Sequence, residues 1–266
     1  METVGDRMTR KISIATPSKP AICSRCGAPY RALSLGAHHL NCPTCDCVIR
    51  QAQTRERQEW QRQERDQRLA AANISPRLAE CTFERFQPKE GNWQAFQQCA
   101  EYPKRWPLQM KEAQGSGLLL WGKPGVGKTH LAAALANRIL ERGARVRFCN
   151  VTEWLNRLRD ELRDREPVGE RRDDLGASDL LVLDDLGAEK GTAWALEKIY
   201  QVVNQRYEGL QPLVVTTNLD LNQLECGVGP RIFGRLLEIC LPAEVKGEDW
   251  RMRIAKERQF RRSSGE

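Results

Sequence analysis

The chain has 266 residues, of which 40% are hydrophobic and 29% are charged. This composition is typical of a folded globular protein and excludes a largely disordered or fibrous one. No run of about 18 apolar residues is present, and the first twenty residues contain no apolar segment, so we expect no membrane span, no secretory signal and a cytoplasmic location. Basic residues exceed acidic ones by 42 to 35, which favours a polyanionic partner, although a high arginine content can equally reflect genome composition.

Five of the ten cysteines lie close together near the N-terminus, whereas the other five are scattered singly among apolar residues. Cys23 and Cys26 form one C-x2-C pair, and Cys42 and Cys45 form a second pair after fifteen intervening residues. Two turns with this spacing offer four thiolates to one tetrahedral zinc ion, and a reducing compartment favours a metal site over disulfides. We therefore predict that these four cysteines bind zinc. Three nearby side chains are alternative ligands: Cys47, His38 and His39.

The cysteine pairs divide the N-terminal quarter into segments. Residues 1–20 are predicted to be a flexible tail, and residues 21–49 the zinc-binding domain. Residues 50–72 contain many good helix formers and no Gly or Pro, with Trp60 and one leucine as the only large apolar side chains. Such a segment predicts an exposed helical linker. Residues 73–266 then form the main domain.

Short apolar runs alternate with helical patterns in the main domain. The predicted strands are residues 117–121, 145–150, 179–184, 212–217 and 239–245. The predicted helices are residues 92–106, 128–142, 152–165, 192–207 and 222–237. Strands that alternate with helices predict an α/β fold in which a parallel sheet lies between helices.

A phosphate-binding motif, G-x-x-x-x-G-K-[ST], lies between the first strand and the first helix of this series. Its glycines allow backbone N–H groups to surround phosphates, and the following helix N-terminus adds positive potential. We expect Lys128 to neutralise charge on the β- and γ-phosphates and Thr129 to bind Mg²⁺. The predicted nucleotide-binding residues of the loop are Gly122, Lys123, Pro124, Gly125, Val126, Gly127, Lys128 and Thr129.

Two further predicted strands end in polar residues. The strand over residues 179–184 ends in Asp184, and Asp185 follows it. A parallel sheet places Asp184 at the same edge as the phosphate-binding loop, where we expect it to bind Mg²⁺ while Asp185 polarises the attacking water. Asn218 follows the strand over residues 212–217 and could orient that water or contact the γ-phosphate.

These motifs occur together with other segments in a specific combination. They are His130-Leu131-Ala132-Ala133-Ala134 after the phosphate-binding loop, residues 179–187, Asn204-x-Arg206-Tyr207, Thr216-Thr217-Asn218, Gly229-Pro230-Arg231-Ile232-x-x-Arg235-Leu236, Ile74-Ser75-Pro76-Arg77-Leu78 and Thr82-Phe83-x-x-Phe86. The combination resembles the bacterial replicative-helicase loaders of the DnaC and DnaI type and the related IstB transposition ATPases. It covers about residues 73–255. The resemblance implies an AAA+ ATPase core that self-associates side by side with ATP at subunit junctions, and it places His130 beside the nucleotide.

The resemblance also implies roles for two arginines. Arg235 looks like the arginine finger that reaches the γ-phosphate of a neighbouring subunit, and Arg251 looks like the second sensor arginine. An arginine supplied in trans stabilises the charge of phosphoryl transfer only in the assembled state. Alternatively, Arg231 and Arg235 are a solvated or phosphate-contacting pair on one helix face. Some twenty residues follow the last strand, which implies a lid that is reduced to one basic helix.

DNA contacts are also expected from the resemblance, because family members line the interior of their ring with two matching segments. The corresponding positions here are Leu162, Arg163, Thr192 and Trp194. A tryptophan in such a position can stack on unpaired bases. Trp194 is an equally good core residue, since Leu196, Ile199 and Tyr200 follow it at near-helical spacing.

We therefore expect an ATP-dependent loader of a hexameric replicative helicase onto single-stranded DNA, with ATP, Mg²⁺ and Zn²⁺ as cofactors and no membrane partner. The zinc-binding domain resembles the module that docks on the helicase in the DnaI type, although a zinc domain can also bind nucleic acid. Two alternatives stay open. One is an IstB-like transposition helper that binds duplex DNA, and the other is a nucleotide-gated DNA-binding scaffold.

Overall fold

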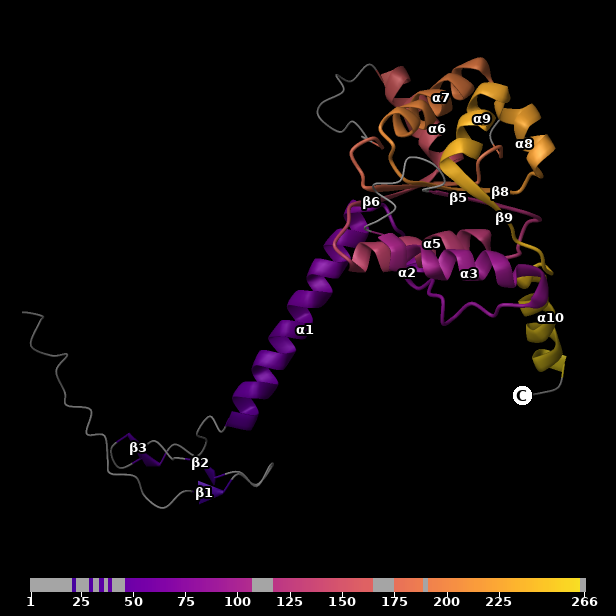
Figure 1. Cartoon of the computed structure of the whole chain (residues 1–266). Coiled ribbons are helices and arrows are strands. Elements are labelled where there is room, and N and C mark those ends of the chain that lie inside the picture. Colours follow the sequence, from indigo (N-terminus) through magenta and orange to yellow (C-terminus); the bar gives the residue numbers. More distant parts are fainter. Residues whose placement is uncertain are drawn as a thin grey trace, which may run out of the picture. The chain divides into compact units, whose positions relative to one another are not determined.

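The computed structural model describes residues 46–106, 117–164, 175–188 and 191–263, together with four two-residue strands between residues 21 and 39 (Figure 1). Side chains are described for residues 53–106, 117–161, 175–188 and 191–256. The chain divides into two units, residues 1–64 and residues 65–266, and we describe each by itself.

The first unit contains two small antiparallel strand pairs and most of a long helix. Strand β1 (Ala21–Ile22) pairs with β2 (Pro29–Tyr30), and β3 (Ser34–Leu35) pairs with β4 (His38–His39). The predicted zinc ligands Cys23, Cys26, Cys42 and Cys45 lie outside the described residues. Helix α1 (Asp46–Ala71) begins before the linker predicted over residues 50–72 and ends one residue earlier, and its Trp60 is exposed, as expected for a sequence with few apolar residues.

A five-stranded parallel sheet is the centre of the second unit. Its order is β6-β7-β8-β5-β9. The strands are β5 (Gly117–Trp121), β6 (Val146–Asn150), β7 (Leu180–Asp184), β8 (Leu213–Thr217) and β9 (Cys240–Glu244). The predicted α/β fold with a parallel sheet is therefore confirmed, and each predicted strand agrees with an observed one to within one residue at either end.

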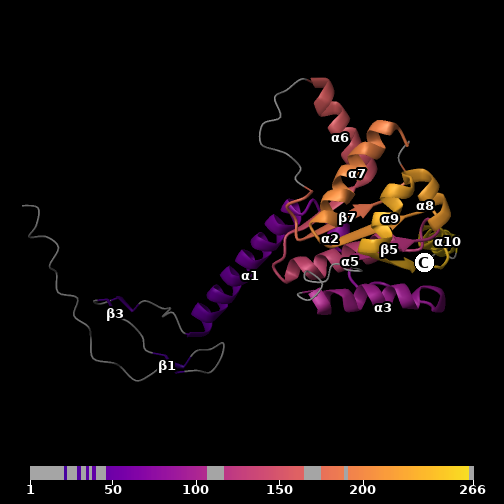
Figure 2. The same ribbon diagram turned by 45° about the horizontal axis from the view of Figure 1, so that its top comes forward.

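Helices cover both faces of this sheet (Figures 1 and 2). One face carries α2 (Pro76–Ala79), α3 (Trp93–Glu101) and α5 (Lys128–Glu141). Short 3-10 turns at Glu90–Asn92 and Tyr102–Arg105 flank α3. The other face carries α6 (Val151–Asp164), α7 (Ala193–Glu208), α8 (Leu221–Val228) and α9 (Pro230–Ile239).

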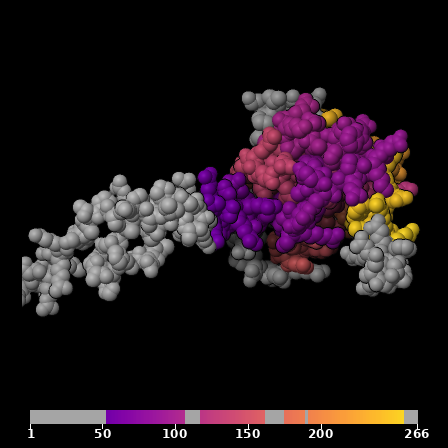
Figure 3. Space-filling model, turned by 90° about the horizontal axis from the view of Figure 1, so that it is seen from below, coloured from indigo at the N-terminus to yellow at the C-terminus, as the bar shows by residue number. Residues whose placement is uncertain are grey.

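Side-chain alternation along the strands creates one apolar layer on each face. In β5, Leu118 and Leu120 join the layer beneath α5, whereas Leu119 joins the layer beneath α7 and α9. The segment that precedes β5 packs over α5, and Figure 3 shows it in purple and magenta over much of that surface. This segment therefore brings residues 70–106 close to the start of α5, where the phosphate-binding loop ends.

The predicted helix over residues 222–237 was wrong in one respect, because two helices occupy this range. Helix α8 begins after a capping box in which Asp220 and Gln223 bond each other's backbone. Gly229 then adopts a φ of 84°, and Pro230 starts α9. A proline cannot donate a backbone hydrogen bond, and a left-handed glycine ends a helix, so the chain turns at this point.

The end of helix α1 contacts the outer edge of the sheet. The backbone N–H of Phe148 in β6 donates to the carbonyl of Ala72 at 2.8 Å. The side-chain amide of Asn73 donates to the carbonyl of Phe148 at 3.1 Å, and Arg147 donates to the carbonyl of Ala71 at 2.9 Å. Three hydrogen bonds thus fix the start of the second unit on β6.

No described helix combines the length and apolar character that crossing a bilayer requires.

Candidate nucleotide-binding site

The phosphate-binding loop joins β5 to α5 with three glycines at positive φ. Gly122, Gly125 and Gly127 have φ values of 145°, 78° and 102°, which side chains rarely adopt. A Cβ atom on Gly127 would come within 2.6 Å of the ring of Phe86, and one on Gly125 within 2.0 Å of the Asp249 carboxylate. The loop therefore requires glycine both for its backbone turns and for its close neighbours.

Lys128 lies in the first turn of α5, and only 4% of its surface is exposed. Its ammonium group donates to the carbonyls of Gly122 at 2.8 Å and Lys123 at 2.7 Å. Burial lowers the pKa of Lys128 to about 8, while the negative charges of Asp185 and Asp184 partly oppose this shift. The loop thus holds a buried amine that loses its proton more readily than an exposed lysine and is close to where phosphates would lie.

Asp184 accepts two hydroxyl hydrogen bonds at the carboxyl end of β7. Thr129 donates to its Oδ1 atom at 2.9 Å, and Thr216 of β8 donates to the same atom at 2.7 Å. Burial raises the pKa of Asp184, and these two hydrogen bonds counteract it. The carboxylate and the Thr129 hydroxyl, both expected Mg²⁺ ligands, are thus brought into contact. Oxygen donors of this kind suit that ion.

Asp185 has a left-handed backbone conformation, with a φ of 59°. Its N–H donates to the Thr216 hydroxyl at 3.0 Å, and its carboxylate accepts from the Asn218 amide at 2.8 Å. Non-glycine residues at positive φ are uncommon and recur at functional sites. The structure therefore places Asp185 and Asn218 side by side, next to Asp184.

An aromatic cluster borders the loop on the side of α3. The ring of Phe86 stacks on Phe96 at 5.6 Å between centroids and lies 5.6 Å from the ring of His130. The Nε2 atom of His130 is 2.8 Å from the carbonyl oxygen of Thr82. The cluster fixes the segment before β5 against the first turn of α5 and presents a flat apolar wall beside the phosphate-binding loop.

The C-terminal helix α10 (Trp250–Ser263) begins at the same loop. The N–H of Trp250 donates to the carbonyl of Gly125 at 3.0 Å, and the N–H of Arg251 donates to the Asp249 carboxylate at 2.8 Å. The Arg251 side chain lines the pocket, and its positive charge contributes to the lowered pKa of Lys128. The predicted C-terminal lid helix is therefore present and contacts the phosphate-binding loop.

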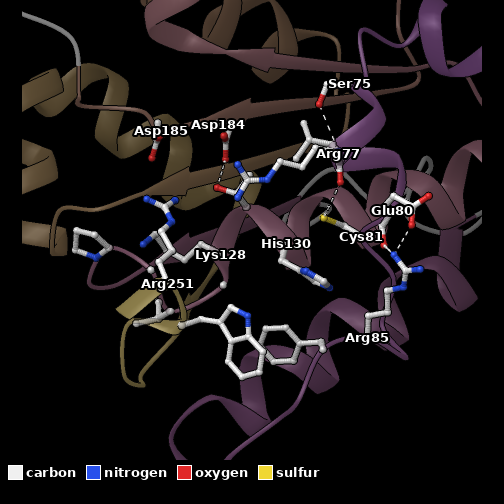
Figure 4. Close-up of a pocket in the computed structure, with 18 of the residues that line it drawn as sticks. Ser75, Arg77, Glu80, Cys81, Arg85, Lys128, His130, Asp184, Asp185 and Arg251 are labelled. Carbon is white, nitrogen blue, oxygen red and sulfur yellow. Dashed lines mark hydrogen bonds and ion pairs between the residues drawn. The ribbon is translucent and has the colours of Figure 1, made fainter. Parts of the chain in front are cut away.

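These groups surround one cavity of about 860 Å³ (Figure 4), which lies within the range typical of small-molecule sites. Its walls include most of the predicted nucleotide-site residues: Pro124, Gly125, Val126, Gly127, Lys128, Thr129, His130, Asp184, Asp185, Asn218 and Arg251. The far wall is formed by α2 and the end of α1.

Arg235 lies on α9 and is not among the residues that line this cavity. Its guanidinium lies 4.6 Å from the centroid of the Tyr200 ring and 5.5 Å from that of Tyr207. A residue that acts on the nucleotide of a neighbouring subunit needs no access to its own pocket. Its position is therefore compatible with the expected role in trans.

The four expected DNA-contacting residues occupy different environments. Thr192 caps α7, because its hydroxyl accepts the Ala195 N–H at 3.2 Å. Trp194 packs against the core, and the Arg159 guanidinium lies 5.2 Å from its ring centroid. Leu162 and Arg163 lie on α6, and their side chains fall outside the described residues.

The motifs assign no role to Phe86 and Arg77, which line the cavity, or to Thr216, which bonds the cavity residue Asp184. Phe86 and Arg77 lie in the segment that precedes β5, so only the tertiary fold brings them to the loop. The register of the sheet explains the position of Thr216. Val182 of β7 lies opposite Val214 of β8, and the same register continued by two residues sets Asp184 opposite Thr216. A hydroxyl at that level can reach a strand-end carboxylate.

Comparisons with known proteins point to one family. The profile described as IstB-like ATP binding protein matches residues 104–258. The replicative helicase loader DnaC of Escherichia coli strain K12 is 28% identical over 167 residues, which are 62% of this chain and 66% of that protein. The loader DnaI of Bacillus subtilis strain 168 is 30% identical over 151 residues, 52% of this chain and 48% of that protein. The matches thus span just under two thirds of the length of this DnaC and about half of the length of this DnaI.

Solved structures show the same likeness. A crystal structure of the DnaC helicase loader superposes with a TM-score of 0.58 at 26% identity and covers 65% of this chain and all of the other. A crystal structure of DnaI gives a TM-score of 0.57 at 26% identity and covers 65% of this chain and 95% of the other. The resemblance to the helicase loaders that the motifs indicated is therefore confirmed.

Proposed function

Because the chain belongs to the family of IstB-like ATP-binding proteins, we propose that it is an ATPase that loads a hexameric replicative helicase onto single-stranded DNA. The observation that carries this proposal is the contact between Thr129 and Asp184 beside Lys128, within a chain that resembles DnaC and DnaI. The loop, the lysine and the carboxylate together are the parts that phosphoryl transfer needs.

The chain's own residues supply most of this chemistry. The loop N–H groups and Lys128 hold the phosphates, and Asp185 with Asn218 orients the attacking water. Thr129 and Asp184 would hold Mg²⁺, since their oxygen atoms lie 2.9 Å apart and are ligands that this ion prefers. When bound, the ion neutralises charge on the phosphates.

Self-association completes the site in this proposal. Arg251 contributes a positive charge from the chain's own α10, whereas Arg235 reaches the γ-phosphate of a neighbouring subunit. Its position outside the chain's own pocket supports this division. Hydrolysis would then depend on assembly, as expected for an arginine supplied in trans.

We also propose that residues 21–49 bind zinc through Cys23, Cys26, Cys42 and Cys45 and dock on the helicase. Residues 1–20 would be a tail, residues 50–72 a helical linker, and residues 73–266 the ATPase domain. The spacing of the cysteines supports the zinc site.

The proposed contacts with single-stranded DNA, for which Trp194 and Arg163 are candidates, rest on the likeness to loaders. A cytoplasmic location is expected for such a protein.

Copurification with a replicative helicase tests the proposal. We expect the full chain to form a complex with the helicase in ATP and to increase the amount of helicase that is bound to circular single-stranded DNA. Replacing the four cysteines with serine should abolish the complex while ATP binding is retained. A complex that survives these replacements would place the docking site elsewhere, and a wild-type chain that leaves helicase loading unchanged would contradict the loader function.

An IstB-like transposition helper is the second candidate, favoured by the description of the matching profile. A pull-down with a transposase in place of the helicase separates the two, because only one partner should bind. The third candidate is a nucleotide-gated scaffold without significant hydrolysis. The adjacent Asp184, Asp185 and Asn218 favour hydrolysis over such a role, and an ATPase assay on the assembled protein distinguishes them.

A further inference from the structure

Helix α2 holds one arginine at the wall of the nucleotide pocket. Ser75 caps this short helix by accepting the Leu78 N–H at 3.4 Å. The buried Asn137 of α5 donates to the carbonyls of Leu78 and Cys81, at 2.9 Å each. Helix α2 is thus fixed to the helix whose first turn carries Lys128 and Thr129.

Arg77 is on this helix, lines the cavity and projects into it (Figure 4). Four other cations of the cavity wall are already engaged. Arg85 forms an ion pair with Glu80, Lys89 lies 3.7 Å from Glu248, and Lys128 bonds two loop carbonyls. Arg253 lies 5.1 Å from the ring centroid of Trp250.

Arg77 has no such side-chain partner. Among the described residues, its guanidinium makes no hydrogen bond or ion pair, and within the cavity wall only the Arg251 guanidinium shares this property. A guanidinium presents five N–H donors in a rigid fork that matches the oxygens of a phosphate, and a bidentate contact of this kind is among the strong hydrogen bonds. The unused donors of Arg77 therefore suit an anionic ligand in the cavity.

We propose that Arg77 is a further nucleotide-contacting residue whose guanidinium binds the phosphate chain from the side of α2. This inference rests on the proposed ATPase function of the same pocket. It assigns a phosphate-binding role to the segment before β5, in addition to the phosphate-binding loop and α10. Arg77 and Arg251 would then approach the phosphates from two different elements, while Lys128 approaches from the loop.

Titration calorimetry with ATP, ADP and adenosine on the full chain tests this. We expect Arg77→Gln to weaken ATP and ADP binding about 10- to 100-fold, the loss that removal of a charge-assisted hydrogen bond produces. Adenosine binding should be unchanged. Arg77→Lys keeps the charge, so its affinity for ATP and ADP should lie between that of Arg77→Gln and that of wild type. Arg142→Gln is the matched control, because Arg142 is exposed at the end of α5. This variant should bind ATP and ADP with wild-type affinity.

Two outcomes would overturn the inference. ATP binding by Arg77→Gln within twofold of wild type would show that Arg77 does not bind phosphate, and an equal loss for adenosine would assign it to the nucleoside. The midpoint of thermal unfolding without nucleotide shows whether each variant is folded. If Arg77→Gln does not fold, Arg77→Lys decides. ATP binding at wild-type affinity by this variant, which keeps the charge but lacks the fork, would argue against a bidentate contact. Absence of ATP binding by wild type would instead contradict the proposed function.

Discussion

The guanidinium of Arg235 on α9 lies 4.6 Å from the ring centroid of Tyr200 on α7, and Tyr207 borders it at 5.5 Å. Tyr207 in turn donates its hydroxyl to Glu238 at 2.9 Å. A cation over aromatic faces is held by the ring quadrupole, and the contact strengthens as water is excluded. The side chain that we propose as an arginine finger is therefore preorganised by its own subunit.

Replacing Arg235 separates ATP binding from hydrolysis. We expect Arg235→Ala to bind ATP as wild type does but to lose most ATPase activity in the assembled state, about 10³-fold or more for an arginine finger. Arg231→Ala is the matched control, since Arg231 is exposed four residues earlier on the same helix. Steady-state ATPase rates and ATP titrations measure both effects, and normal hydrolysis by Arg235→Ala would show that it is not a finger.

The pH dependence of ATP binding should follow Lys128. Its pKa is about 8 in the folded chain and 10.5 in an exposed lysine, so the folded protein loses this proton at lower pH. We expect ATP affinity to fall as the pH rises above about 8, with proton uptake on binding, because phosphates favour the charged form. Calorimetry in two buffers of different ionisation enthalpy measures the uptake.

The same pKa shift has a second consequence, for stability. Between about pH 8 and 10.5 the unfolded chain binds more protons at this site than the folded chain, so this group raises the free energy of unfolding as pH increases. Lys128→Met should remove both effects, whereas Lys123→Met, at an exposed loop position, should remove neither. Proton uptake that persists in Lys128→Met would assign it to another group.

Thr216→Val tests the hydroxyl that joins the two aspartates. Thr216 is fully buried, donates to Asp184 at 2.7 Å and accepts the N–H of Asp185 at 3.0 Å. The isosteric change leaves both groups without this partner, so we expect a loss of about 1–3 kcal/mol in the free energy of unfolding. It should also raise the pKa of Asp184 further and increase the Mg²⁺ concentration needed for ATPase activity.

Thr217→Val is a control for this change, because Thr217 is equally buried but its hydroxyl accepts the Leu219 N–H, at 3.2 Å, and bonds neither aspartate in the described structure. Urea unfolding and Mg²⁺ titrations of the ATPase rate compare the two variants. An identical Mg²⁺ requirement for both would mean that Thr216 does not tune the aspartate.

Gly125→Ala tests the contact between the phosphate-binding loop and α10. The new Cβ would lie 2.0 Å from the Asp249 carboxylate, at a φ of +78°. We expect the variant to fold but to bind ATP at least tenfold more weakly, because the start of α10 and Arg251 must move. Gly143→Ala introduces a similar strain at a φ of +84°, and no described residue lies within 4 Å of the new Cβ atom. It should cost about 1–2 kcal/mol of stability and leave ATP binding intact.

The predictable part of the site is the part that local sequence determines. The phosphate-binding loop needs only a strand, a glycine pattern and a helix, and the contact between Thr129 and Asp184 follows because parallel strands end at one edge of the sheet. By contrast, Arg77 is separated by 51 positions in the sequence from Lys128, and only the packing of α2 on α5 brings it to the pocket.

The split between α8 and α9 had a local signal that helical periodicity concealed. Apolar residues such as Leu224, Val228 and Ile232 continue with nearly the same spacing across the break, so the pattern predicts one helix. Gly229 and Pro230 are the stronger signal, because they act on the backbone rather than on side-chain burial. The docking of Trp250 on Gly125 had no local signal at all.

Strand β6 lies at one end of the sheet order, so one side of its backbone has no strand partner in the part of the chain that the structure describes. Hydrogen bonds to Ala72 and Asn73 occupy the backbone N–H and the carbonyl of Phe148 on this strand. Free edge strands invite pairing with other chains and aggregation. We therefore expect the end of α1 to protect the protein from aggregation. A fragment that begins after Asn73 should aggregate at concentrations where one beginning at residue 65 stays dispersed, as measured by light scattering.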